Sequence, residues 1–141
     1  DHYNGNPWID ITIAGELKSV SAKNASQNIG GLNSIWQITC HMISWRNALI
    51  ARVMDSPHPH PDNNFIEEIR DTSSKAWKDT LRKFARSQKD IISFLKTQED
   101  MLLEKVSPAS GYSYFELVNA ILIHDSYHLG QIVLIKKLLK K

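Results

Sequence analysis

The sequence predicts an all-α protein, a four-helix bundle with at least one long connection. The main evidence is three long segments in which apolar residues recur every three or four positions, the period of one buried helical stripe. These segments cover residues 34–55, 72–97 and 113–139, and a weaker segment at residues 11–20 supplies the fourth helix. No stretch alternates apolar and polar residues as a strand does, and no internal repeat is present. The whole chain, residues 1–141, is therefore expected to form one domain.

The first long helix has chemical signals at both ends. Asn33 or Ser34 can accept hydrogen bonds from the amides that its first turn leaves free. The sequence SPHPHP at residues 56–61 ends the helix, because each proline disfavours helical backbone in the residue before it. Earlier in the chain, Ser21 can cap a short turn over residues 22–27. The capping and terminating residues thus agree with the helical period.

A long connection precedes the second long helix, and a shorter interruption separates it from the third. Residues 56–71 contain three prolines and are expected to form an irregular connection with a little helix. The helix at 72–97 carries lysines and arginines opposite its apolar stripe, as a solvated face does. Pro108 and Gly111 then interrupt the pattern, after which Ser113 can cap the last helix. That helix should end in its basic residues, whose charge complements the negative end of the helix dipole.

The composition argues against membrane and nucleic-acid functions. No apolar run approaches the roughly 20 residues of a membrane span. A net charge of +2, without a basic stretch interleaved with aromatic residues, gives no footprint for nucleic acid. Cys40 is the single cysteine, so an internal disulfide is impossible, and no basic-then-apolar leader opens the sequence. A cytoplasmic location is expected.

Histidines supply the main functional signal. His124 and His128 lie four residues apart on the inward seam of the last helix, where such neighbours have Cβ atoms about 5–6 Å apart. His41 lies on the inward stripe of the helix at 34–55. If these helices are neighbours, three imidazoles can bind one ion and leave a coordination position open for water or substrate. In the alternative interpretation they are ordinary histidines at the edge of the core, and each ring then needs a hydrogen-bond partner.

Two polar residues flank the histidine pair on the last helix. Gln131, one turn beyond His128, can orient a ligand or a bound water, or it can be a polar residue that faces a wet cavity. Asp125 is expected to point outward, with a role in orienting a ligand as the alternative. Both are candidates for contacts behind the metal ligands.

The remaining candidate side chains are expected to be structural. Cys40 is rotated about 100° around the helix from His41, which makes it a small buried residue and not a ligand. Tyr114 and Tyr127 are expected to serve in packing and not to supply a phenol to a cavity. The tryptophans on apolar stripes are assigned to the core: Trp36, Trp45 and Trp77. Trp45 can also line a pocket. The histidines between the prolines are assigned to a solvated loop: His58 and His60.

Three sequence segments together resemble the DinB/YfiT-like superfamily of four-helix-bundle proteins. They are YNGNPW near the start, NSIWQITCHMISWR, and ILIHDSYHLGQIVLIKKLL, in which HDSYHLGQI is the most specific part. The resemblance covers nearly the whole chain, although the N-terminal helix looks shorter and less regular than the family pattern. It implies that His41, His124 and His128 bind a divalent metal ion, with nickel or zinc expected.

The resemblance also implies a class of reaction. Superfamily members with known activity include transferases that use bacillithiol, glutathione or mycothiol, in which a metal ion converts the thiol of the cosubstrate into a nucleophilic thiolate. We therefore expect a metal-dependent thiol S-transferase, with a low-molecular-weight thiol and a small-molecule substrate as its partners. A homodimer formed through outer apolar residues such as Phe94 or Leu139 is also expected.

Two other functions use the same three histidines. A metal-dependent hydrolase would activate water instead of a thiol, but the inward stripes offer no obvious carboxylate as general base, which argues against it. A non-catalytic, stress-related protein would bind a metal or a small molecule without turnover. The sequence also lacks a Ser-His-Asp set, a phosphate-binding glycine loop and a CxxC pair. Any chemistry is therefore assigned to the metal.

Overall fold

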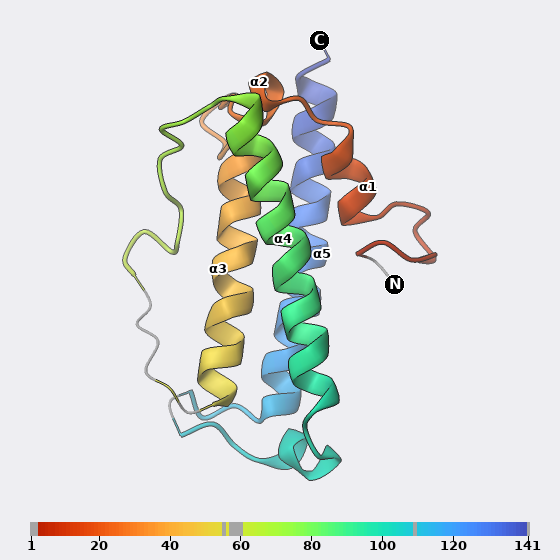
Figure 1. Ribbon diagram of the computed structural model, residues 1–141, viewed down its shortest axis with the longest axis vertical. Coiled ribbons are helices and arrows are strands. Elements are labelled where there is room, and N and C mark those ends of the chain that lie inside the picture. The colour runs from red at the N-terminus through yellow and green to blue at the C-terminus, as the bar shows by residue number, and fades with distance from the viewer. Residues whose placement is uncertain (1–2, 55, 57–60, 109, 141) are drawn as a thin grey trace.

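The computed structural model describes residues 3–54, 56, 61–108 and 110–140, and these residues form helices and loops without a strand. The prediction of an all-α bundle is therefore confirmed. In chain order the elements are α1 (Ile13–Lys18), α2 (Ala22–Ala25), α3 (Ile35–Val53), α4 (Ser74–Lys96), the 3₁₀ helix η1 (Asp100–Glu104) and α5 (Tyr114–Leu138) (Figure 1).

Three long helices make the body of the bundle. Helix α3 packs against both α4 and α5, while α1 lies against α5 and α4 on the other side (Figure 1). Helices α3 and α4 run in the same direction, so the connection between them returns along the length of the bundle. This is the predicted long connection, and its described residues 61–73 pass beside α3, which carries the first of the three histidines (Figure 1).

The fourth helix is shorter than predicted. It was expected over residues 11–20, but α1 covers only Ile13–Lys18. Its ends are set by two side chains: the Thr12 hydroxyl accepts a hydrogen bond from the Gly15 amide, and the Ser19 hydroxyl donates to the Glu16 carbonyl. These caps compete with further helix, because they bind the backbone groups that another turn would use. Helix α1 therefore occupies the fourth position of the bundle at one end only (Figure 1).

Serine caps explain why the long helices begin close to the predicted residues. Ser34, and not Asn33, caps α3 in a capping box with Gln37, and Ser113 caps α5 in the same way with Glu116. Each long helix begins and ends within one or two residues of the predicted limits. The little helix expected in the connection is absent from its described part, residues 56 and 61–71. There the backbone forms turns, and Asn64 and Phe65 adopt left-handed φ angles of 51° and 58°.

The core confirms most of the apolar stripes. Trp36 and Trp77 are buried with their rings 5.0 Å apart, and each indole N–H donates a hydrogen bond, to the Thr80 hydroxyl and the Val20 carbonyl respectively. Phe94 and Leu139, expected on an outer dimer face, are partly buried against the core and keep some exposed surface. The dimer and its face stay a prediction. Within the described residues, every helix is too short or too polar to cross a membrane.

Candidate metal centre

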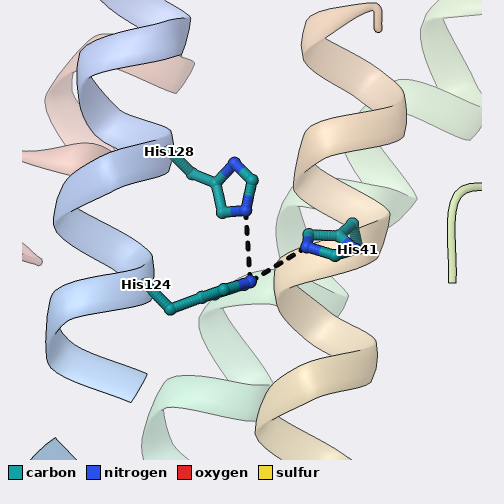
Figure 2. Close-up of side chains that lie close together, drawn as sticks. All are labelled: His41, His124 and His128. Atoms are coloured by element: carbon teal, nitrogen blue, oxygen red, sulfur yellow. Dashed lines mark hydrogen bonds between the residues drawn. The ribbon is translucent and has the colours of Figure 1, made fainter. Parts of the chain in front are cut away.

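The three predicted histidines meet between α3 and α5. His41 comes from α3, His124 and His128 come from α5, and their rings point toward one another (Figure 2). The Nε2 atom of His124 lies 2.9 Å from Nε2 of His41 and 3.1 Å from Nε2 of His128. Two metal–nitrogen bonds of about 2.0–2.1 Å that meet at 90–110° place their nitrogens roughly 2.9–3.4 Å apart. These two spacings therefore suit a single divalent ion, and the three ring nitrogens all lie within 4.8 Å of one another.

The partners of the other ring nitrogens decide which tautomers are present. Nδ1 of His41 lies 2.7 Å from the Asn64 carbonyl oxygen, which only accepts hydrogen bonds, so this Nδ1 carries the proton. Nδ1 of His128 lies 2.7 Å from Oε1 of Gln131, whose amide nitrogen donates to the Tyr127 hydroxyl. Both rings thus turn an unprotonated Nε2 toward His124. Two unprotonated nitrogens that face a third ring nitrogen require positive charge between them, either a metal ion or a proton on Nε2 of His124.

The connection between α3 and α4 contributes to this arrangement through its backbone. Asn64, whose carbonyl binds His41, and Phe65, the next residue, both have the left-handed φ angles that non-glycine residues seldom adopt. The Phe65 ring lies nearly perpendicular to the Trp45 ring, with the ring centres 5.7 Å apart. The turn therefore supports the first histidine from the side of the long connection, a role that sequence reasoning missed.

Burial differs among the three histidines and shows where the site opens. His41 is 3% exposed and His128 is 7% exposed, whereas the side chain of His124 is 23% exposed. The Trp45 ring lies 5.7 Å from the ring of His124 and 6.3 Å from that of His41. Trp45 therefore lines the site, as the alternative assignment for this residue predicted. A small molecule would reach the ring nitrogens past His124 and Trp45.

Burial lowers the pKa of His128 to about 4, and the neighbouring His124 and His41 rings act in the same direction, whereas the hydrogen bond to Gln131 opposes the shift. The imidazole is therefore neutral at physiological pH. Only the neutral ring has a lone pair available for a metal. The electrostatics of His128 thus suit a ligand.

We expect His128 to make the metal-free protein less stable as the pH falls from about 6.5 to about 4. The unfolded chain takes up this proton near the ordinary pKa of about 6.5, whereas the folded pKa is about 4. Between these values the unfolded chain binds more protons than the folded one, so acid favours unfolding. The stability that the neutral His128 ring contributes is fully present above about pH 6.5. Urea unfolding across this range measures the slope. A His128→Gln variant should lose this part of it, and identical slopes in both proteins would contradict the assignment.

Asp125 corrects one expectation. It was expected to point outward, but it is 2% exposed and binds Arg46, which is 0% exposed. Oδ2 of Asp125 accepts hydrogen bonds from Nη2 and Nε of Arg46 at 2.6 and 3.2 Å. Burial alone would raise the pKa of Asp125, but the His124 ring and the Arg46 guanidinium outweigh it and hold this pKa below its ordinary range. Asp125 is therefore an ionised carboxylate beside the three histidines.

Sequence reasoning missed Arg46 as a residue of the centre. The available signal was its position on α3, four residues after Met42 and three before Leu49, both of which are buried. An arginine on an inward stripe requires a buried partner, because an unpaired charge is costly away from water. That requirement pointed to an acidic residue on a facing helix.

The remaining candidate side chains differ in burial and in their contacts with the histidines. Cys40 is half-buried against the core, where burial raises the pKa of its thiol, in agreement with a structural role. Tyr114 is buried, as expected of a packing residue, whereas Tyr127 is 63% exposed and its hydroxyl accepts the hydrogen bond from Gln131. Gln131 thus binds the back of a metal-ligand candidate. His58 and His60 lie outside the described residues.

Comparison with known proteins agrees with the fold. The family model of the DinB superfamily matches residues 16–132, which include all three histidines. No curated protein and no solved structure shows significant similarity to this chain.

Proposed function

Because the chain belongs to the DinB superfamily, we propose that it is a divalent-metal-dependent enzyme and that it joins a low-molecular-weight thiol, through its sulfur, to a small electrophile. The observation that supports this most is the convergence of three Nε2 atoms, one of them from His124, whose side chain is 23% exposed. Three protein ligands leave coordination positions for another molecule, which distinguishes a catalytic site from a closed structural one. Nickel and zinc both suit imidazole ligands.

The chain's own residues would serve this reaction in three ways. The histidines hold the ion, while the Asn64 carbonyl and the Gln131 amide keep His41 and His128 in the tautomers that can bind it. Trp45 and Phe65 form an aromatic wall against which an apolar electrophile can lie. A bound divalent ion would supply the positive charge that lowers the pKa of a thiol to near neutrality. The thiol would release its proton to water, and its sulfur would form a bond to the electrophilic carbon as the leaving group departs to solvent.

The position of Asp125 favours transfer over hydrolysis. A hydrolase needs a base that takes a proton from water on the side where the ion is held. Asp125 instead gives one oxygen to Arg46, and its other oxygen faces Nδ1 of His124, on the far side of that ring from the three Nε2 atoms. A cytoplasmic location would suit a thiol-dependent reaction, because low-molecular-weight thiols are kept reduced there.

We expect the zinc- or nickel-loaded protein to conjugate glutathione or bacillithiol to 1-chloro-2,4-dinitrobenzene, which is followed by absorbance, and not to hydrolyse p-nitrophenyl acetate without thiol. A His41→Ala variant should fall to the uncatalysed rate, because it lacks one ligand. Cys40→Ser is the matched control on the same helix, and it should retain the activity. Unchanged turnover in His41→Ala would refute the proposal. Metal binding without conjugation of either thiol would favour the non-catalytic alternative.

A further inference from the structure

The buried ion pair between Arg46 and Asp125 lies where the three long helices meet. Besides Asp125 on α5, the Arg46 guanidinium binds two groups of α4: it donates to the Ser87 hydroxyl at 3.1 Å and the Phe84 carbonyl at 3.4 Å. Its charge also lies 4.1 Å from the centre of the Phe84 ring. The guanidinium is therefore fixed from several sides. It fixes in turn the one carboxylate oxygen that it binds, Oδ2 of Asp125.

The second oxygen of this carboxylate has a different environment. Oδ1 of Asp125 and Nδ1 of His124 are both buried, and neither has a hydrogen-bond partner among the described residues. They face each other at 3.9 Å. Buried polar atoms without partners are rare, because each one loses its hydrogen bonds to water. Two such atoms side by side, one an acceptor and the other able to donate, form an incomplete pair that would close if the imidazole moved toward the carboxylate.

The histidine cluster supplies a reason for this pair. His41 and His128 each have an oxygen acceptor behind the ring, at Nδ1, which leaves Nε2 unprotonated and turned toward His124. His124 is the most exposed of the three and lacks such a contact at hydrogen-bond distance. A carboxylate behind a metal-binding histidine fixes the tautomer, orients the ring and makes the ligand more basic. Asp125 is the group placed to do this for His124.

We propose that Asp125, held by Arg46, positions His124 for the metal by accepting a hydrogen bond from its Nδ1–H. This inference rests on the proposed metal site but not on the thiol reaction. It also explains why a buried ion pair is present at all. Such pairs often contribute little net stability compared with well-packed apolar residues, because both charges lose their hydration. Here the pair connects the packing of α3 and α4 to the ligand geometry on α5.

The test is an Asp125→Asn variant that keeps the shape of the side chain. The Arg46 donors should select the amide oxygen, which turns the NH₂ group toward Nδ1 of His124. That donor favours the wrong tautomer, in which Nε2 carries the proton. We expect the affinities for zinc and for nickel, each measured by competition with a chelating dye, to fall about 10–100-fold. Ser87→Ala is the matched control, because it removes another Arg46 contact without touching the carboxylate.

The outcomes separate positioning from stability. Ser87→Ala should lower the melting temperature and leave metal affinity unchanged. If Asp125→Asn binds both metals as tightly as the wild type, or if Ser87→Ala weakens binding equally, the positioning role is wrong. If the wild type binds neither metal, the metal site itself fails. Should Asp125→Asn not fold, ¹⁵N NMR of the zinc-loaded wild type decides: the role requires a slowly exchanging proton on Nδ1 of His124, and a rapidly exchanging one overturns it.

Discussion

Replacing Arg46 with methionine is expected to lower the free energy of unfolding by about 3–5 kcal/mol. The substitution leaves the Asp125 carboxylate buried without its positive partner, and it removes the hydrogen bonds to Ser87 and Phe84. Methionine fills much of the same space, so the loss reflects the stranded charge more than a cavity. Urea unfolding of the metal-free protein at neutral pH measures the change.

The control for this experiment removes both charges. A double variant, Arg46→Met with Asp125→Leu, has no unpaired charge in the bundle and should regain most of the lost stability, because apolar side chains of similar volume often replace buried ion pairs without cost. A loss below about 1 kcal/mol in the single variant, within the range of exposed pairs, would show that the pair is not buried in solution.

Replacing His41 with alanine is expected to abolish specific metal binding. Its Nε2 is one of three converging nitrogens, and it is the only one contributed by α3. Loss of a direct ligand should reduce zinc or nickel affinity by more than the 10–100-fold that removal of a group behind a ligand costs. Asn47→Ala, at an exposed position of the same helix, should bind metal normally.

The same His41→Ala variant should keep its fold, because the helices are held together by clusters of apolar residues from several elements. Circular dichroism checks this while a chelator competition measures affinity. Wild-type affinity in a folded His41→Ala variant would mean that the metal is held elsewhere. Loss of the helical signal would instead assign His41 a role in folding.

Features that depend on short stretches of sequence were predictable. Ser34 and Ser113 begin α3 and α5 because their hydroxyls accept bonds from amides three residues on, a requirement visible in the sequence. The histidine set was predictable for a similar reason. A spacing of four places His124 and His128 on one face of a helix, and the apolar stripe places His41 on the inward face of another. Only the register between the helices had to come from the fold.

Features that depend on several elements at once were not predictable. Helix α5 buries Asp125 as well as His128, because Asp125 binds Arg46 of α3, which in turn donates to groups of α4. The prediction assumed one inward stripe along this helix, and Asp125 does not lie on that stripe. The support of His41 by Asn64 comes from a left-handed turn in the long connection, and local composition does not specify such a backbone. The contacts behind the ligands, rather than the ligands, are what the sequence alone left open.

The central claim, that three histidines hold one divalent ion, is tested most directly by counting metal per chain. The protein should be purified without a tag or a nickel column, dialysed with zinc or nickel and then against metal-free buffer, and analysed by plasma mass spectrometry beside a His124→Ala variant. We expect about one ion per wild-type chain and almost none in the variant. Equal metal in both proteins, or none in the wild type after exposure to either ion, would contradict the claim and leave the three rings as the lining of a cavity.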